Sequence, residues 1–233
     1  MTLFTSIDVR DAVEAEMPWK DRQLPRTAYQ ALGAVASEHG TRPAISFQIL
    51  SDPNSKAETL TWSDLHGRVT QAANLFHSLG VGKDDVVAFL MPNCNETAVV
   101  LLGGMTAGIV NPINPLLDVE QIAGILNETK AKVLVTLKSF PKTDVAQKAA
   151  EAVRFAPSVK TVLEVDLLRY LAPPKSWIVP LIRPKLKVQH HAKVLTLGAE
   201  LDKQPRDKLG FDEGEEDRVA AYFHTGGTTG TPK

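Results

Sequence analysis

The chain has 233 residues, 43% of them hydrophobic and 23% charged, which is ordinary for a folded globular protein and argues against a disordered one. The formal net charge of -1 provides no overall basic field that would favour nucleic acid as a partner. The single cysteine, Cys94, excludes an intramolecular disulfide, suits a reducing cytoplasm and is interpreted as a packing residue.

The first 24 residues are interpreted as an extension that lies on the surface of the domain, because they are charged and lack a clear period. They do not form a signal peptide, since Arg10 and neighbouring acids interrupt the region where its apolar core would lie. The most apolar run, residues 98–110, has 13 residues and contains three glycines. A bilayer span needs roughly 18 or more apolar residues, so this run predicts a buried helix.

Hydrophobic periodicity predicts alternating helices and strands from residue 25 to residue 165. Apolar runs without alternation indicate strands that are covered on both faces. The predicted elements, in chain order, are a helix over 25–39, strands over 44–50 and 58–62 joined as a hairpin, a helix over 65–79, a strand over 86–90, a helix over 96–107, a strand over 109–110, a helix that begins after Asp118, a strand over 132–137, a helix over 143–155 and a strand over 161–165. Short strand–helix units of this kind favour a layered α/β/α fold with a mostly parallel sheet, in which ligands sit outside the carboxyl ends of the strands.

Capping residues mark the ends of two of these helices. Ser63 is available as the N-cap of the helix over 65–79, and Gly80 provides its stop. Asp118, with Gln121 three residues further on, predicts a capping box at the start of the later helix.

The stretch from Arg169 to Lys193 differs in composition from the rest of the chain. It holds four prolines, Trp177 and six basic residues without an acid, whereas residues 200–217 hold eight acids. One interpretation is a contact with a membrane surface, or a lid. We favour a solvated excursion from the fold, assigned to residues 166–216, because proline prevents the amphipathic helix that surface binding usually needs.

A strand predicted over Val219–Phe223 runs directly into a glycine- and threonine-rich loop. Three glycines allow several backbone N–H groups to converge on phosphate oxygens, four threonines add hydroxyl donors, and a terminal lysine adds positive charge. The spacing is not that of the Walker loop, the Rossmann fingerprint or the kinase glycine loop. The sequence therefore predicts a polyphosphate-binding loop, whose binding residues are Thr225, Gly226, Gly227, Thr228, Thr229, Gly230 and Lys233.

Residues 222–233 resemble the signature of the adenylate-forming superfamily, which includes acyl-CoA synthetases, luciferases and the adenylation domains of peptide synthetases. The usual core is Thr-Ser-Gly-Thr-Thr-Gly-x-Pro-Lys, and Gly226 stands in place of the serine, which removes a hydroxyl but keeps the backbone N–H. Residues 61–65, 90–96 and 111–120 are similar to family segments that occur in the same order. The resemblance covers roughly residues 25–165 and 217–233, so residues 25–233 are expected to form the N-terminal portion of the large AMP-binding domain, with 166–216 atypical.

The resemblance implies a two-step ligase that uses ATP, Mg²⁺ and CoA. A carboxylate attacks the α-phosphorus of ATP, pyrophosphate leaves, and the acyl group of the acyl-adenylate then passes to a thiol, expected to be that of CoA. The loop holds the β- and γ-phosphates, Thr225 is the implied magnesium contact, and Lys233 corresponds to a lysine at a mobile rim. A fatty acid is the acid expected from overall likeness to fatty acyl-CoA synthetases.

No catalytic residue is assigned, because the family's ribose-binding aspartate, hinge and catalytic lysine lie beyond the loop. We therefore expect the chain to lack the C-terminal small domain and to be inactive by itself, with an unpaired edge at 219–223 that favours self-association. The alternative is a stand-alone module that binds nucleotide or a partner without catalysis. His224 is interpreted as structural or nucleotide-flanking, because an ionised carboxylate needs no general base in the first step.

Overall fold

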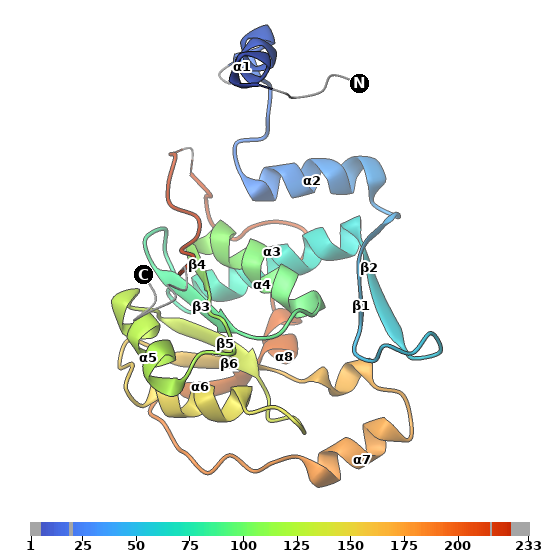
Figure 1. Ribbon diagram of the computed structural model, residues 1–233, viewed down its shortest axis with the longest axis vertical. Helices are drawn as coiled ribbons and strands as arrows, with labels where there is room; N and C mark the ends of the chain where they lie inside the picture. The colour runs from blue at the N-terminus through green and yellow to red at the C-terminus, as the bar shows by residue number, and fades with distance from the viewer. Residues whose placement is uncertain (1–5, 19–20, 215, 225–233) are drawn as a thin grey trace.

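The computed structural model describes residues 6–18, 21–214 and 216–224, and its centre is a five-stranded sheet between layers of helices (Figure 1). The strand order is β4-β3-β5-β6-β7, and every neighbouring pair is parallel. This confirms the predicted layered α/β fold with a mostly parallel sheet. The strands are β3 (Val86–Leu90), β4 (Ile109–Pro112), β5 (Val133–Leu137), β6 (Thr161–Val165) and β7 (Lys193–Thr196).

Helices cover both faces of this sheet (Figure 1). The pair α3 and α4 lies on one face with α2 outside it, and α5 and α6 lie on the other. A separate antiparallel hairpin, β1–β2, stands beside the layers, and α1 and α7 lie at opposite ends of the long axis. The remaining bounds are α1 (Ile7–Glu16), α2 (Ala28–His39), β1 (Pro43–Gln48), β2 (Ala57–Thr61), α3 (Trp62–Ser78), α4 (Asn95–Ala107), α5 (Val119–Glu128), α6 (Val145–Val153), the 3-10 turn η2 (Leu167–Tyr170), α7 (Lys175–Ile182) and α8 (Leu197–Leu201).

The central strands β3 and β5 form the middle of the hydrophobic core. All five residues of each strand are buried. This confirms the prediction, made from the continuous apolar runs, that these strands are covered on both faces. The α4–β4 turn packs tightly against the residues that precede β3. A Cβ on Gly108 would lie 2.5 Å from the carbonyl oxygen of Asp85, so glycine is required for this close approach.

The N-cap of α3 is Thr61 rather than the predicted Ser63. The Thr61 hydroxyl accepts a hydrogen bond from the backbone N–H of Asp64 at 3.1 Å, and the Asp64 carboxylate accepts from the N–H of Thr61 at 3.3 Å. The Ser63 prediction was wrong because β2 runs to Thr61, whose extended backbone is the conformation of an N-cap, whereas Ser63 already lies in the first helical turn. Hydrogen bonds from Thr61 and Arg206 lower the pKa of Asp64, which keeps the capping carboxylate ionised.

Two other helix ends agree with the sequence. Gly80 has a φ of +82° immediately after α3, which is the left-handed conformation expected of a glycine stop. Asp118 and Gln121 make the predicted reciprocal capping box at the start of α5, with distances of 2.8 and 3.2 Å between their side chains and the opposing backbone nitrogens.

The stretch expected to be a solvated excursion contains regular structure. Its middle forms α7 with Pro180 inside the helix, so the expectation that proline prevents a helix here was wrong. Proline removes one backbone donor, but α7 has only eight residues, and its C-terminal flank is anchored by Arg183, whose guanidinium donates to the Asp166 carboxylate at 2.9 Å. Further along, β7 joins the sheet beside β6, which the short run Lys193–Thr196 did not reveal in the sequence.

The apolar run over 98–110 forms most of α4 and the first half of β4. Its residues are mostly buried, as predicted for a helix of the core. Within the described ranges, no helix combines the length and hydropathy that would be required to cross a bilayer.

Replacing Thr61 by alanine is expected to lower the free energy of unfolding by about 1 kcal/mol, because the capping box at α3 loses its hydroxyl acceptor. Ser63→Ala, two residues further on, is the matched control and is expected to change stability by less than about 0.5 kcal/mol. Urea unfolding of both variants tests the assignment. A larger loss for Ser63→Ala than for Thr61→Ala would restore Ser63 as the cap.

Cys94 is the buried N-cap residue of α4. Burial and, to a smaller extent, the nearby Glu96 carboxylate raise the pKa of its thiol to about 11, so the thiolate fraction at neutral pH falls on the order of 100-fold. We expect iodoacetamide to alkylate the native protein at least about 100-fold more slowly than the urea-unfolded protein at the same pH. Mass spectrometry of quenched samples measures both rates, and similar rates would show that the thiol is accessible.

Candidate functional site

The predicted phosphate-binding residues, Thr225 to Gly230 and Lys233, lie outside the described residues. The phosphate loop and the magnesium contact at Thr225 therefore remain predictions. Within residues 6–18, 21–214 and 216–224, no group of three His, Cys, Asp or Glu side chains is placed to hold a metal ion. The structure does describe the segment that leads into the loop, which we call the approach segment, residues 216–224.

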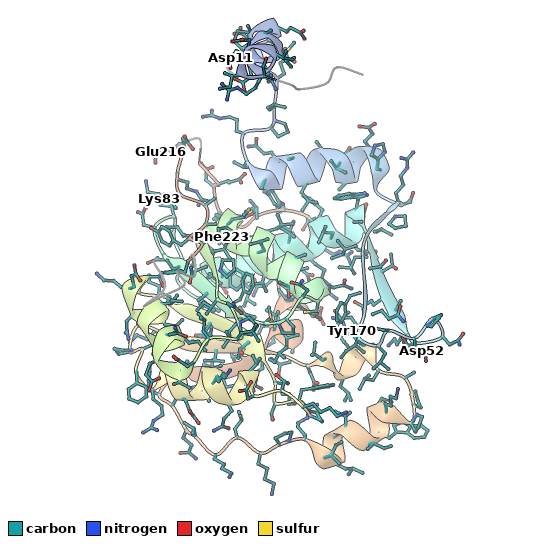
Figure 2. All side chains as sticks on the ribbon, in the orientation of Figure 1. Asp11, Asp52, Lys83, Tyr170, Glu216 and Phe223 are labelled. Carbon is teal, nitrogen blue, oxygen red and sulfur yellow. The ribbon has the colours of Figure 1, made fainter. Side chains whose placement is uncertain are left out.

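The approach segment is hydrogen-bonded to the edge strand β4. The N–H of Val110 donates to the carbonyl of Ala220 at 3.0 Å, and the N–H of Tyr222 donates to the carbonyl of Val110 at 2.9 Å. These bonds make one parallel bridge between Val110 and Ala221, instead of the strand predicted over Val219–Phe223. Among the described residues the segment pairs with β4 on one side only and through a single bridge. Phe223, labelled in Figure 2, is 67% exposed by its accessible surface.

Arg218 fastens the approach segment to the C-terminal end of α4. Its Nη1 donates to the carbonyl of Gly108 at 2.7 Å, and its Nη2 donates to those of Met105 and Thr106 at 2.8 and 3.0 Å. The last carbonyls of a helix have no partners within the helix and carry partial negative charge, so a guanidinium is well suited to this position. The chain entering the predicted loop is thus tied to a core helix.

Asn111, a fully buried residue of β4, holds the last described residues of the approach segment. Its Nδ2 lies 2.9 Å from the carbonyl oxygen of Tyr222 and 3.1 Å from Nδ1 of His224. Because the carbonyl can only accept, the amide must present its NH₂ group, and Nδ1 of His224 accepts the second hydrogen. The ring proton is therefore assigned to Nε2, which faces a carboxylate oxygen of Glu128 at 3.6 Å.

These contacts give His224 a structural position, with only 11% of its side chain exposed. The predicted nucleotide-flanking role remains a prediction. The Oδ1 atom of Asn111 is buried and has no hydrogen-bond partner among the described residues. Buried amide oxygens are normally satisfied, so this atom is an acceptor available next to the start of the predicted loop.

The surroundings of His224 belong to the amino-terminal edge of the sheet. A cavity of about 360 Å³ is lined there by Tyr222, Phe223 and His224 together with residues at the start of β3 and the end of α5, which are Asp84, Val86, Glu128 and Thr129. The expectation that ligands of a parallel sheet sit at its carboxyl edge stays a prediction, because the predicted loop lies outside the described residues. The approach segment makes its backbone hydrogen bonds with edge strand β4, and Nε2 of His224 lies 3.6 Å from a carboxylate oxygen of Glu128 at the end of α5.

A charged cluster, in which Glu96 and Tyr170 are buried and Glu58 is half-buried, lies near the carboxyl ends of the strands. It consists of Glu58 on β2, Glu96 in the first turn of α4, and Arg169 and Tyr170 on η2. Nη1 of Arg169 donates to Glu96 at 2.8 Å, its Nη2 and Nε donate to Glu58 at 2.5 and 3.1 Å, and the Tyr170 hydroxyl donates to Glu96 at 2.5 Å.

The charged cluster joins three elements that are distant in the sequence. Tyr170 is buried between the hairpin and the sheet (Figure 2), where its ring meets that of Phe47 edge-on at 4.7 Å between centroids. Burial and the hydrogen bond to Glu96 raise the pKa of Tyr170, so the phenol stays protonated and donates. Two carboxylates already neutralise Arg169, so we interpret the cluster as structural rather than as an anion site.

Sequence reasoning missed both Arg218 and the charged cluster. Arg218 follows a run of acids and was not singled out, and Arg169 was counted only as one of the basic residues of the 169–193 stretch. The one available signal was Glu96, an acid placed in the first turn of a helix directly after a buried strand. Its partners lie 73 and 74 residues away in the chain, so their identity could not be read locally.

A model of the AMP-binding enzyme family matches residues 32–233 of the chain. The chain is 35% identical over 223 residues to the marinolic acid–CoA ligase of Pseudoalteromonas sp. (strain SANK 73390), covering 93% of this chain and 30% of that protein. It is 29% identical over 228 residues to the acetyl-coenzyme A synthetase of Sodalis glossinidius (strain morsitans), covering 96% of this chain and 32% of that protein. The chain thus spans about a third of the length of these curated relatives.

Among solved structures, the adenylation domain of the carboxylate reductase from Mycobacterium chelonae matches with a TM-score of 0.67. The sequence identity is 20%, and the match covers 96% of this chain and 35% of that chain. At this level of identity the likeness concerns the fold alone, and it agrees with the layered α/β arrangement described above.

Replacing Arg218 by methionine is expected to lower the free energy of unfolding by about 2 kcal/mol, because three carbonyls at the end of α4 lose a charged donor. Arg154→Met, at an exposed arginine after α6, is the control and is expected to cost less than about 0.5 kcal/mol. Urea unfolding of both variants provides the comparison. Equal losses would mean that the hydrogen bonds of Arg218 to the end of α4 contribute nothing specific to stability.

Proposed function

Because the chain belongs to the family of AMP-binding enzymes, we propose that it forms the phosphate-binding part of an ATP-dependent acid–thiol ligase. The proposed reaction makes an acyl-adenylate from a carboxylic acid and ATP and then transfers the acyl group to CoA. The observation that carries the proposal is the motif over 225–233, which directly follows a segment fastened to the edge of a parallel sheet. The two ligases to which the chain is similar form CoA thioesters according to their names, which supports the proposal.

In the proposed first step, a carboxylate oxygen of the acid bonds to the α-phosphorus of ATP. The bond from that phosphorus to the bridging oxygen breaks, and pyrophosphate leaves with the bonding electrons. The loop from Thr225 to Gly230 would bind the β- and γ-phosphates through backbone N–H groups and threonine hydroxyls, which stabilises the charge of the leaving group. Mg²⁺, when bound, would neutralise phosphate charge, and Thr225 is the residue proposed to hold it.

The described residues have a positioning role in this proposal. Two of them, Asn111 and Arg218, fix the chain just before the loop. Asn111 binds the carbonyl of Tyr222, and Arg218 ties its own segment to the end of α4. A loop that is held at its start loses less conformational entropy when it closes around phosphates, and it keeps its donors oriented for the reaction. The Oδ1 atom of Asn111, which has no partner among the described residues, would be available to accept a hydrogen bond from the loop.

The acid substrate is proposed only as a carboxylic acid, because the names of the two relatives point to different acids. A fatty acid is the narrower proposal. We also propose a cytoplasmic location, which the single buried cysteine favours. Separation of a culture into cell extract and medium would test the location, and recovery in the medium would overturn it.

Gly227→Val in the ligase that contains this chain is expected to lower acid-dependent ATP–pyrophosphate exchange by at least about 100-fold, because a side chain blocks the backbone approach to phosphate. Gly124→Val is the matched control, because a Cβ at this exposed position of α5 meets no atom within 4 Å. Near-normal exchange in the Gly227 variant would remove the loop from the mechanism.

The same assay addresses the 233 residues on their own. They correspond to about a third of the length of the relatives, so we propose that they give no detectable exchange. Exchange by the 233-residue chain would contradict this part of the proposal. Tight binding of Mg–ATP without exchange would instead favour a non-catalytic nucleotide-binding module.

A further inference from the structure

The helix α7 presents large apolar side chains to solvent. The exposed fractions are 70% for Trp177, 47% for Ile178, 85% for Leu181 and 58% for Ile182. At 3.6 residues per turn these four side chains fall within an arc of about 140°, so they form one continuous face, which we call the α7 face. Isolated exposed apolar residues are common, but four on two turns of one helix indicate an interaction surface.

The α7 face is held in place by contacts on the rest of the helix. Val179 is buried. Arg183 donates to Asp166 and to the carbonyl of Ser139, whose hydroxyl donates in turn to the carbonyl of Pro184 at 2.6 Å. The helix is therefore anchored to the loop after β5 and to the end of β6, and its apolar side chains remain directed outward.

The stretch of chain that contains α7 is rich in basic residues and has no acid. Residues 167–199 contain six basic residues and no Asp or Glu. Lys175, Lys185 and Lys187 are exposed, and none forms an ion pair with any residue that the structure describes. By contrast, Arg169 and Arg183 are paired with acids of the fold. Along the chain, three exposed lysines without an ion pair to any described residue thus precede and follow the apolar side chains.

We propose that the α7 face docks on the surface of a membrane that carries anionic lipids. Tryptophan and aliphatic side chains that enter the headgroup region, with lysines beside them, form the pattern of an interfacial helix. With eight residues, α7 is about 12 Å long and lies on a bilayer rather than crossing it.

Two further observations favour a membrane over a protein partner. Trp177 and Leu181 protrude from the helix, and a protein partner would need a matching groove, whereas lipid chains adapt to protruding groups. In addition, α7 lies at one end of the long axis of the molecule, away from the central sheet (Figure 1), a position that suits contact with an extended surface. This inference does not depend on the proposed ligase activity.

The test is co-sedimentation of the full chain with vesicles. We expect binding to vesicles of phosphatidylcholine with about one third phosphatidylglycerol, at least about tenfold weaker binding to pure phosphatidylcholine, and release at high salt. Equal binding to both vesicle types, or binding to neither, would overturn the proposal.

Matched variants locate the binding surface. Trp177→Ser/Leu181→Ser and Lys185→Glu/Lys187→Glu are each expected to weaken binding at least about tenfold. The controls are Phe155→Ser, which removes an exposed aromatic ring elsewhere, and Lys130→Glu/Lys208→Glu, which reverses two exposed lysines outside α7. Unchanged binding in the α7 variants, or equal losses in the controls, would overturn the assignment to α7.

Two measurements separate this proposal from simpler outcomes. The substituted side chains are exposed, so unchanged urea midpoints for the α7 variants would show that weaker binding is not a folding defect. If the midpoints fall, tryptophan fluorescence carries the test: vesicle binding should shift the emission to the blue, and this shift should be absent in Trp177→Phe. Sedimentation without lipid detects the competing occupant, a second copy of the chain. Self-association that Leu181→Ser abolishes, with no binding to anionic vesicles, would assign the α7 face to a protein interface instead.

Discussion

The burial of β3 and β5 on both faces is the constraint on which the rest of the structure depends. Every residue of these two strands is buried, so each face of the sheet needs its own helical layer. The pair α3 and α4 supplies one layer and α5 and α6 the other, and the connections must cross from one strand to its parallel neighbour through these helices. The polar groups that the site uses therefore lie at the ends of the strands and on the outer strand β4.

The carboxyl ends of the strands and the outer strand β4 make different kinds of contact. At the carboxyl edge, Arg169 neutralises Glu58 and Glu96 and fastens the hairpin to α4. At β4, the outer strand offers unpaired backbone groups, and the approach segment satisfies those of Val110 while Arg218 binds the end of α4. Both are contacts that hold segments in place, and only the second leads directly into the motif that the AMP-binding family shares.

The α7 region illustrates how anchoring contacts override a local preference. Proline disfavours a helix interior, yet Pro180 lies within α7, which Val179 and Arg183 attach to the core. Because those anchors occupy one side of the helix, the apolar residues on the other side face solvent. The composition that first suggested a solvated excursion therefore has a different physical basis, which is a fixed helix whose apolar side chains are exposed among the described residues.

The sequence alone determined most helices and strands, the Asp118 capping box and the Gly80 stop, because each of these depends on residues within one or two turns. It also identified the family through the order of residues in the 225–233 loop. Tertiary structure decided that Thr61 rather than Ser63 caps α3, that β7 joins the sheet, and that 219–223 makes one bridge rather than a strand. The partners of Arg218 and Arg169 lie as many as 113 residues away in the chain, and chain folding alone brings such groups within hydrogen-bond distance.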